Sequence, residues 1–503
     1  MNTTKQSKKA SVLIPVLCTA FNFIAFLCFF SARWFVNVYG RIGFDSILYT
    51  LRSSLGGVQS GLILQYLLKA LLPCVVCTCI CFFLFFMLPR ISKKQKAAKG
   101  NNHKPVSVLL SILLSLFLIL FAAFDAQFVD YVIAQFSESE LYEDHYADPN
   151  SVTIQFPEEK RNLIYIMLES METSYLSEDL GGALDKNLIP ELYDLAKENT
   201  CFSHSESDVG GFYTTKGATW TVGAMVAQTA GIPLKTPTED VNQYGASGEA
   251  FLPGVTSITD ILHDAGYYQA LMVGSDATFG GRKQYYLQHS MDTVYDLYTA
   301  RKDGIVPPNY FVWWGMEDMY LFEYAKQELT EIAGREEPFA FTMLTVDTHH
   351  IGGYQCAYCT PDTGGESYDR SISCSSRQVA DFVRWIQAQP FYENTTVIIV
   401  GDHESMDNGY FQRNVNSGYQ RLLYNCFINS PVDTERVTNR QFAAVDLFPT
   451  TLAAIGCTIE GDRLGLGTNL YSNIPTLTEV MGFPKFNNEL AKASDYYTEN
   501  FHK

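Results

Sequence analysis

Positive charge is scarce in this sequence of 503 residues. It has 36 lysines and arginines against 54 aspartates and glutamates, which makes the formal net charge −18. Proteins that bind nucleic acid present basic surfaces to the phosphate backbone, so this balance excludes nucleic acid as a partner. The sequence also lacks internal repeats and low-complexity tracts, which excludes a repeat architecture. An acidic exterior leaves a few local basic residues, Arg282 above all, to attract anionic groups.

Uncharged stretches long enough to cross a membrane lie near the start of the chain. They cover residues 10–32, 70–89 and 106–124. About 20 apolar residues in a helix span the ~30 Å hydrocarbon layer of a bilayer, so we expect about three transmembrane helices. A cleaved signal peptide is the alternative for the first stretch, but that stretch is longer than the apolar part of a typical signal peptide.

Basic residues flank these stretches and predict their orientation. Lys5, Lys8 and Lys9 precede the first stretch, and the loop between the second and third holds a basic cluster: Arg90, Lys93, Lys94, Lys96, Lys99 and Lys104. Because basic flanking residues stay in the cytoplasm, the chain beyond the third stretch is expected outside it. This orientation predicts a multi-pass protein of the cell membrane.

The change in composition along the chain divides it into three parts. We expect a membrane anchor over residues 1–128, an acidic and aromatic linker over 129–160, and an extracytoplasmic domain over 161–503. The amphipathic segment 44–57, between the first two apolar stretches, is either an interfacial helix or a plain connecting helix.

A buried strand leads directly into metal-binding residue types near residue 400. The β-branched run that ends at Val400 is followed by Gly401, Asp402 and His403. Such continuous apolar runs are typical of parallel strands that are covered on both faces, and ligands collect at the carboxyl ends of these strands. The run predicts an α/β domain with a mostly parallel central sheet flanked by helices, although the tripeptide alone is more often a turn than a site.

A second apolar run of the same kind begins at Asn162 and ends near Glu169. Glutamate and aspartate oxygens with one imidazole suit Mn²⁺, Mg²⁺ or Zn²⁺, whereas a thiolate site would use cysteine. No cysteine lies near either strand end. We therefore expect one divalent metal held by Glu169, Asp402 and His403.

Thr219, Trp220 and Thr221 lie between the two runs and precede a stretch able to start a helix. A threonine at this place is ordinarily an N-cap. Alternatively, a metal-bound threonine hydroxyl at a helix N-terminus is a nucleophile, because both the ion and the helix dipole favour its ionised form. We favour Thr221 over Thr219 for that role.

These motifs together resemble the membrane-anchored phosphoglycerol transferases and lipoteichoic acid synthases of the sulfatase and alkaline-phosphatase superfamily. The resemblance covers most of the chain beyond residue 150 and rests on the order of four motifs: Leu168-Glu169-Ser170, Thr219-Trp220-Thr221, Val346-Asp347-Thr348-His349-His350 and Gly401-Asp402-His403. It implies metal ligands at Glu169, Thr221, Asp402 and His403, with Thr221 as the residue that becomes phosphoglycerylated. It also implies Mn²⁺ as the preferred ion.

The resemblance implies two substrate-binding residues as well. Arg282 matches the family arginine that holds the substrate phosphate, and a guanidinium suits that task because its donors form a planar fork. His349 matches the substrate-site histidine, which donates a hydrogen bond to phosphate or carries a proton to the leaving group. The alternative readings are a surface charge for Arg282 and a packed imidazole for His349 or His350.

The sequence departs from its relatives in two respects. Lipoteichoic acid synthases have a further histidine shortly before the arginine, whereas this chain has Met272-Val-Gly-Ser-Asp-Ala277 there. The contacts to the acceptor are therefore in doubt. The Cys-x-Pro-x-Arg motif of true sulfatases is also absent, which excludes their formylglycine nucleophile.

Six of the 12 cysteines lie outside the apolar stretches, and three of these, Cys356, Cys359 and Cys374, are close in sequence. Outside the cytoplasm such cysteines favour a disulfide, whose pairing the sequence leaves open. A zinc site is the alternative, although the C-x-x-C pair has no second matched pair.

The leading hypothesis is transfer of glycerophosphate from phosphatidylglycerol, through Thr221, to a teichoic acid, glycolipid or glycan of the cell envelope. Within the same fold, a phosphoethanolamine transferase or a lipid phosphodiesterase is the alternative. A different class is a non-enzymatic membrane sensor on a decayed scaffold, whose mark would be the loss of a metal ligand. All four predicted ligands are present in the sequence.

Overall fold

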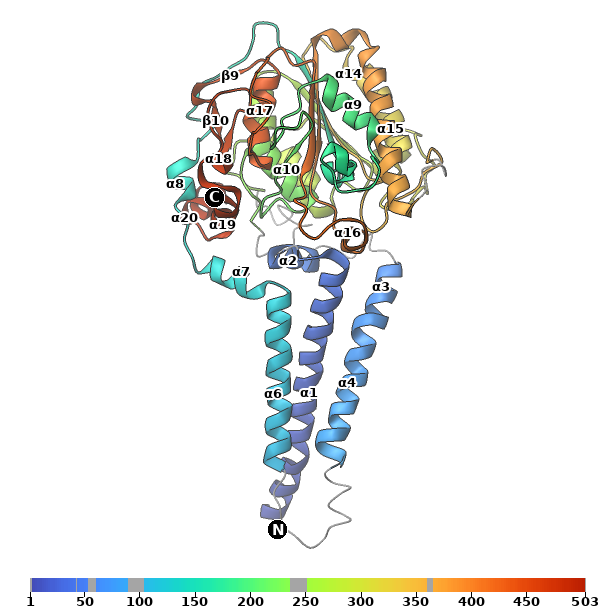
Figure 1. Ribbon diagram of the computed structural model, residues 1–503, viewed down its shortest axis with the longest axis vertical. Coiled ribbons are helices and arrows are strands. Elements are labelled where there is room, and N and C mark those ends of the chain that lie inside the picture. Colours follow the sequence, from blue (N-terminus) through green and yellow to red (C-terminus); the bar gives the residue numbers. More distant parts are fainter. Residues whose placement is uncertain are drawn as a thin grey trace. The chain divides into compact units, whose positions relative to one another are not determined.

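The computed structural model describes residues 2–41, 43–52, 60–88, 104–235, 251–359 and 365–502 (Figure 1). Its chain forms two compact units. The first comprises Met1–Phe44 and Gly56–Val132, and the second comprises Asp45–Leu55 and Ile133–Lys503.

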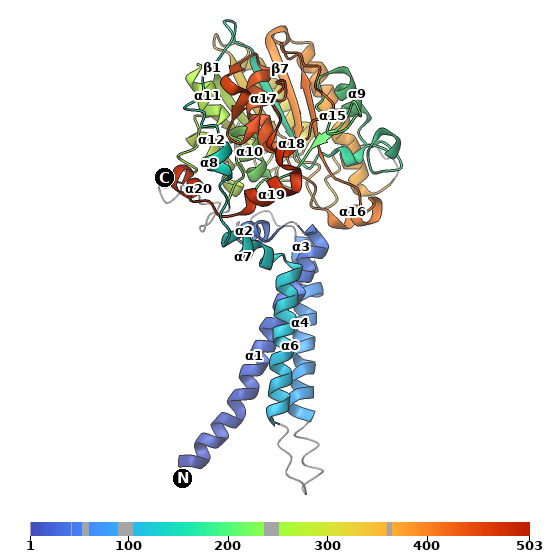
Figure 2. The ribbon, with the colours of Figure 1, turned by 60° about the vertical axis from the view of Figure 1, so that its left-hand side comes forward.

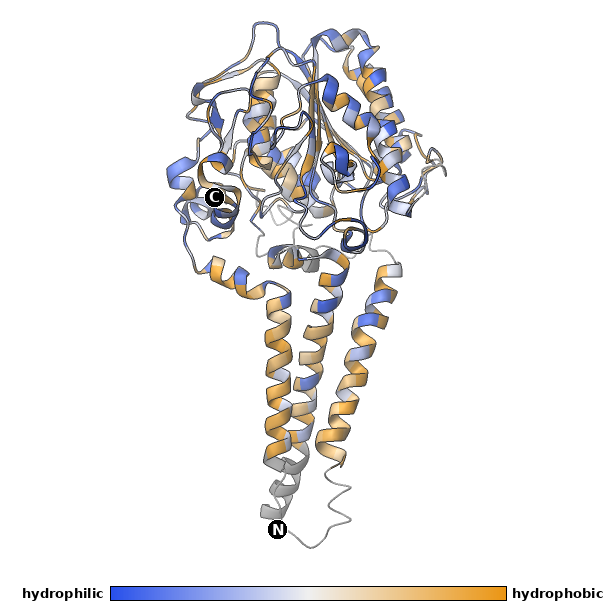
Figure 3. Ribbon diagram, viewed as in Figure 1, coloured by the Kyte–Doolittle hydropathy of each residue, from blue (hydrophilic) through white to orange (hydrophobic). Residues whose placement is uncertain are grey.

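The first unit contains three helices long and apolar enough to cross a membrane, as the sequence predicts. The apolar spans are Leu13–Tyr39, Gly61–Met87 and Val106–Asp125, and Figure 3 shows hydrophobic residues along all three. They belong to a run of helical elements: α1 (Asn2–Tyr39), α3 (Ser60–Tyr66), a π-helical turn (Leu67–Leu71), α4 (Leu72–Phe82), a second π-helical turn (Phe83–Met87) and α6 (Lys104–Asp125). The protein is therefore a membrane protein.

The second span begins earlier than the uncharged run from residue 70 indicates. Lys69 lies immediately before that run, but it does not mark the start of the span. The apolar span includes Lys69 and begins at Gly61. Helical hydrogen bonds join backbone groups, and a long lysine side chain can extend toward a polar boundary, so one charge does not end the helix. The basic side chains used to predict orientation lie outside the described side chains, and the orientation stays a prediction.

Polar contacts hold the first and third spans to each other. Asn22 Oδ1 accepts hydrogen bonds from Ser111 Oγ at 3.1 Å and Ser115 Oγ at 2.6 Å, which joins α1 to α6. Arg33 Nη1 lies 3.3 Å from Asp125 Oδ2 near the other end of the same pair. In a medium that offers no water, such partners remove the cost of an isolated polar group.

The second unit is built on a seven-stranded sheet of order β3-β8-β7-β2-β6-β4-β5. Neighbours from β7 to β5 are parallel, whereas β8 and β3 are added antiparallel. The strands are β2 (Asn162–Leu168), β3 (Gly211–Phe212), β4 (Tyr268–Val273), β5 (Thr293–Tyr295), β6 (Phe339–Leu344), β7 (Thr395–Gly401) and β8 (Leu423–Ile428). The predicted α/β fold with a mostly parallel sheet is confirmed.

Helices cover both faces of this sheet, as Figures 1 and 2 show. Leu163, Tyr165 and Met167 of β2 point into one apolar core, while Ile164 and Ile166 point into the other. Burial on both faces explains why these strands read as unbroken apolar runs. The first core is covered by α10 (Thr221–Ala230), α11 (Ile258–Asp264), α12 (Arg282–Gln288) and α17 (Leu447–Ala454), and the second by α9 (Pro190–Glu198), α14 (Asp318–Ile332) and α15 (Ser367–Gln387).

Shorter elements complete the second unit. Tyr142 of α8 stacks on Tyr496 with ring centroids 6.2 Å apart, so part of the predicted linker packs against the C-terminal helices. The remaining helices and strands of this unit are α2 (Phe44–Arg52), α8 (Leu141–His145), β1 (Ile154–Gln155), α13 (Leu297–Lys302), α16 (Asn408–Asn414), β9 (Thr458–Ile459), β10 (Arg463–Leu464), β11 (Gly467–Thr468), α18 (Leu477–Met481), α19 (Phe483–Ala491) and α20 (Asp495–Phe501). Most of α7 (Phe128–Gln135) belongs to the first unit.

Candidate active site

Two neighbouring parallel strands deliver the predicted acidic residues to one edge of the sheet. Leu168 of β2 pairs with Gly401 of β7, so the residues that follow them, Glu169 and Asp402, lie next to each other. The β6 strand lies on the other side of β2 and contributes Thr345, whose Oγ1 accepts the backbone N–H of Glu169 at 3.0 Å. The site therefore lies at the carboxyl ends of adjacent parallel strands.

Glu169, Asp402 and His403 form a buried cluster. His403 Nε2 lies 3.4 Å from Asp402 Oδ2 and 3.7 Å from Glu169 Oε1. One candidate ligand atom from each of the three residues lies within 4.8 Å of the others. Thr221 Oγ1 lies 3.4 Å from His403 Nε2, so the structure brings all four predicted metal ligands together.

Hydrogen bonds orient these side chains. Asp402 Oδ1 accepts the backbone N–H of Ser170 at 2.8 Å and that of His403 at 2.6 Å. His403 Nδ1–H donates to the carbonyl oxygen of Glu404 at 2.9 Å. Nδ1 carries the proton in that bond, so neutral His403 presents an unprotonated Nε2 to the carboxylates, as a metal-binding imidazole does.

The cluster has the charge and the open acceptor that a cation requires. Burial raises the pKa of Asp402 to about 7, and the neighbouring charge of Glu169 adds to the effect. Within the described part of the chain, Asp402 Oδ2 is buried without a hydrogen-bond partner. A divalent cation would offset this negative charge and use the open oxygen, and the oxygen and imidazole donors fit Mn²⁺, Mg²⁺ or Zn²⁺.

The two threonines of the Thr-Trp-Thr motif have different surroundings. Thr221 is the first residue of α10, with Trp220 at the N-cap position, and its hydroxyl faces His403. Thr219 Oγ1 instead lies 2.9 Å from Ser46 Oγ of α2. The helix dipole at the start of α10 favours negative charge on Thr221. The contacts of the two hydroxyls favour Thr221 as the nucleophile more strongly than sequence position alone does.

Arg282 is the first residue of α12 and is buried. Its burial contradicts the alternative that Arg282 is a surface charge. Its Nη2 donates to Ser275 Oγ at 3.0 Å and its Nε to the carbonyl oxygen of Phe279 at 3.1 Å. Its positive charge reaches His349 and contributes to lowering the pKa of that histidine. The guanidinium is therefore part of the electrostatic environment of the site.

His349 is held in one orientation beside the cluster. Its Nδ1–H donates to the carbonyl oxygen of His350 at 2.7 Å, and its ring packs on Trp314 with centroids 4.5 Å apart. Burial, with nearby charge on His403 and Arg282, lowers the pKa of His349 to about 4. Neutral His349 therefore presents an unprotonated Nε2 to the site, and its role toward the substrate stays a prediction.

Sequence reasoning missed Trp314 and treated His350 only as a possible packed imidazole. Trp314 packs on His349, and His350 joins Glu169 and His349 in a second group of closely spaced candidate ligands. In the sequence, the position of His350 directly after His349 could have indicated that it also lies at the site. Trp314 lies in a loop far from the other motifs in the sequence, and nothing near it indicates this contact.

The three clustered cysteines also come together in space. Cys356 Sγ lies 3.8 Å from Cys374 Sγ and 3.9 Å from Cys359 Sγ, and all three are free thiols. The predicted disulfide, for which no pairing was chosen, stays a prediction.

Comparisons with known proteins identify the family and the fold of this chain. The sequence model described as Sulfatase matches residues 161–457. Phosphoglycerol transferase I of Xanthomonas campestris pv. campestris is 30% identical over 322 residues, which are 63% of this chain and 43% of that protein. Phosphoglycerol transferase I of Salmonella choleraesuis is 28% identical over 443 residues, which are 87% of this chain and 54% of that protein. The chain thus spans about half the length of these curated relatives.

A solved structure shows the same fold. The lipoteichoic acid synthase LtaP from Listeria monocytogenes superposes with a TM-score of 0.50 and 17% sequence identity, covering 66% of this chain and 81% of that one. Residues 161–457, which the Sulfatase model matches, contain the sheet and every residue of the candidate site. Because the Sulfatase model covers more than half of the sequence, this chain belongs to the sulfatase family.

Proposed function

We propose that the protein is a phosphotransferase that moves glycerophosphate from phosphatidylglycerol to a hydroxyl of a cell-envelope glycan, glycolipid or teichoic acid. The observation that carries the proposal is the position of Thr221, at a helix N-terminus and 3.4 Å from His403 of the buried cluster. A hydroxyl in that place suits nucleophilic attack on phosphorus. The names of the curated relatives, phosphoglycerol transferase I, support glycerophosphate as the transferred group.

In this proposal, Glu169, Thr221, Asp402 and His403 hold one divalent cation, with Mn²⁺ as the proposed ion. When bound, the cation supplies positive charge that favours loss of the Thr221 proton and offsets negative charge on the phosphoryl oxygens. Hard oxygen donors and one imidazole support this choice of ion.

The first half of the reaction transfers the glycerophosphate to the protein. Thr221 Oγ1 forms a bond to phosphorus, and the bond from phosphorus to the diacylglycerol oxygen breaks. The proton lost by Thr221 is balanced by the one that the departing diacylglycerol takes up. Arg282 holds the phosphate through its planar guanidinium, and its burial strengthens that interaction by excluding water.

The second half passes the group to the acceptor. An acceptor hydroxyl attacks phosphorus and the bond to Thr221 Oγ1 breaks. His349 Nε2, which is unprotonated while Nδ1–H donates to the carbonyl of His350, accepts the proton of the acceptor. The proton that the acceptor loses is balanced by the one that Thr221 regains, so His349 is neutral again at the end of the cycle. The negative phosphate would raise the pKa of His349 and so strengthen it as a base. We propose that the domain works on the extracytoplasmic face of the membrane, as the basic residues that flank the spans predict.

The test compares Thr221→Val with Thr219→Val in the full chain in detergent. Valine keeps the shape of threonine but removes the hydroxyl, and Thr219 is the matched control because its hydroxyl is directed to Ser46. We expect release of diacylglycerol from phosphatidylglycerol to fall by at least about 10³-fold in Thr221→Val and to remain close to normal in Thr219→Val. Mass spectrometry should find one glycerophosphoryl group on the Thr221 peptide.

Three results would contradict the proposal in different ways. An unchanged rate in Thr221→Val would refute the nucleophile. A phosphoethanolamine group on Thr221 after incubation with phosphatidylethanolamine, with none from phosphatidylglycerol, would refute the donor. Lipid cleavage with water as the only acceptor would make the protein a phosphodiesterase.

A further inference from the structure

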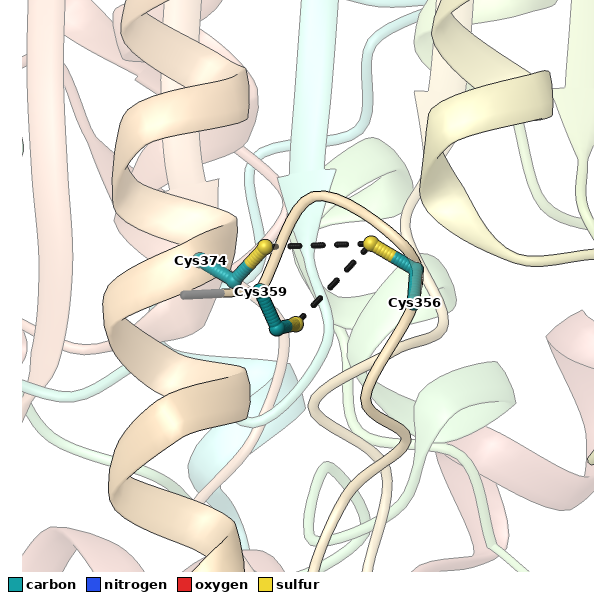
Figure 4. Close-up of side chains that lie close together, drawn as sticks. All are labelled: Cys356, Cys359 and Cys374. Atoms are coloured by element: carbon teal, nitrogen blue, oxygen red, sulfur yellow. Dashed lines mark hydrogen bonds between the residues drawn. The ribbon is translucent and has the colours of Figure 1, made fainter. Parts of the chain in front are cut away.

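Cys356, Cys359 and Cys374 form a compact sulfur cluster outside the candidate active site. Two of them lie in the loop after β6, and the third lies in α15. Figure 4 shows the three side chains directed toward one another, and their sulfur atoms all lie within 4.8 Å. Cys356 and Cys374 are buried. Nothing in the proposed phosphoryl transfer uses this cluster.

The sulfur separations match those around a tetrahedral metal ion. Zinc binds thiolates at about 2.3 Å, and a tetrahedral angle between two such bonds places the sulfur atoms roughly 3.8 Å apart. The separations from Cys356 to Cys374 and to Cys359 are 3.8 and 3.9 Å. An S–S bond is only about 2.05 Å long, so the cluster has the spacing of ligands that share an ion.

We propose that Cys356, Cys359 and Cys374 bind a zinc ion that joins the loop after β6 to α15. The three thiolates supply three ligands of a tetrahedral site, and solvent or another oxygen donor takes the fourth position. Binding displaces the thiol protons to solvent, and neither sulfur nor zinc changes its oxidation state. The spacing C-x-x-C, followed by a third cysteine on a helix, is compatible with such a site.

Polar groups around the cluster suit metal-bound thiolates. Gln378, one helical turn after Cys374, directs Nε2 to Cys374 Sγ at 3.5 Å and to Cys356 Sγ at 3.7 Å. Backbone N–H groups of Tyr358 and Cys359 also interact with Cys356 Sγ. Donors of this kind stabilise thiolate charge and fix the ligands in place, as outer-shell partners do in metal sites.

A buried carboxylate beside the cluster provides an independent reason for a cation. Asp347 is only 2% exposed, and neither of its side-chain oxygens has a hydrogen-bond partner among the residues that the structure describes. Its electrostatic interaction with Cys356 is repulsive when both groups are ionised. A zinc ion at the sulfur atoms would cancel two of the three thiolate charges and so reduce the repulsion between the cluster and Asp347.

The zinc ion would stabilise the loop that carries His349. The backbone N–H of Tyr354 donates to the Asp347 carbonyl at 2.7 Å, and Ser371 Oγ of α15 donates to the Tyr354 carbonyl at 2.9 Å. The cluster ties the far end of this loop to the same helix. Any effect on turnover rests on the proposed function, whereas metal binding by the cysteines does not.

Metal analysis of the full chain, purified in detergent under reducing conditions without chelator, tests the proposal. Cys374→Ser should lose one equivalent of zinc per chain, while Cys457→Ser, which alters another buried cysteine, should keep it. Asp402→Asn should also retain this zinc, because Asp402 belongs to the other site. Cobalt added to the unmodified protein should give sulfur-to-metal charge-transfer absorption, which oxygen and imidazole ligands alone do not produce.

The cobalt spectrum needs no variant, so it decides the matter even if Cys374→Ser fails to fold. Absence of the charge-transfer band in the reduced protein would overturn the proposal. So would equal zinc content in folded Cys374→Ser and the unmodified protein. A disulfide among the three cysteines in protein isolated without reductant, with no zinc bound after reduction, would restore the disulfide reading. None of these measurements depends on lipid turnover, so they fail or succeed separately from the proposed phosphoryl transfer.

Discussion

Arg282 shows at the residue scale how burial changes the meaning of a charge. Its guanidinium lies inside the protein at the start of α12, where Ser275 and Phe279 accept two of its hydrogen bonds. Its charge reaches His349, and a planar guanidinium can bind two phosphate oxygens at once. These two features support the proposal that Arg282 binds the substrate phosphate.

Arg282→Lys should weaken phosphate binding without removing the charge. Lysine lacks the planar fork and keeps only a point charge, so we expect kcat/KM for phosphatidylglycerol to fall by roughly 10- to 100-fold. Steady-state diacylglycerol release measures this change. Arg301→Lys is the matched control, because Arg301 contacts the carbonyl oxygen of Tyr310 instead. An equal loss in both variants would show that the effect is not specific to the site.

Much of the site could be predicted at this scale. Glu169, Asp402 and His403 were predictable because each follows an apolar strand, and strand ends can be recognised from local sequence. The preference for Thr221 over Thr219 preceded the resemblance and rested on its position before a predicted helix, and the contacts of each hydroxyl give it a firmer physical basis. Trp314 was not predictable, because its contact with His349 depends on how two distant loops pack.

At the scale of elements, close packing at the end of β7 brings the proposed metal ligands Asp402 and Glu169 together. A Cβ atom placed on Gly401 would lie 2.1 Å from the carbonyl oxygen of Met171. Backbone carbonyl atoms cannot move aside as a flexible side chain can. Gly401 therefore allows β7 to approach the loop after β2 closely enough for Asp402 and Glu169 to share one site.

Gly401→Ala should displace the ligands that follow it. We expect a destabilisation of roughly 1–3 kcal/mol from overpacking, together with weaker binding of the divalent metal. Denaturant unfolding and calorimetric metal titration measure the two effects. Gly418→Ala is a matched control, since a Cβ atom there meets nothing within 4 Å. Normal metal affinity in Gly401→Ala would contradict the role assigned to this close approach.

At the scale of the whole molecule, the two units have separate hydrophobic cores. The core of the first unit is formed by span residues such as Ala25, Cys74 and Leu118. Both cores of the second unit use residues from Leu141 to Phe501. Neither hydrophobic core of the second unit includes a span residue. The sheet and its covering helices therefore bury their apolar surface without the spans.

A fragment comprising residues 133–503 should therefore fold on its own. We expect it to unfold cooperatively, to bind divalent metal and to acquire a glycerophosphoryl group on Thr221 from a short-chain, dispersed phosphatidylglycerol. Its rate on phosphatidylglycerol in vesicles should fall by about 10²-fold, because it loses the high effective concentration that membrane attachment provides. The full chain reconstituted in the same vesicles is the reference. An unfolded fragment would contradict the separation of the cores.

Local patterns in the sequence determined the three apolar spans, the buried parallel strands and the residue types at their ends. Each depends on the length of an apolar run or on residues adjacent in the chain, and such features persist whatever the rest of the protein does. Only the tertiary structure decided which hydroxyl faces His403, that Arg282 is buried, and that three cysteines on a loop and a helix lie close together. Those arrangements arise from packing between segments far apart in the sequence, which no local pattern encodes.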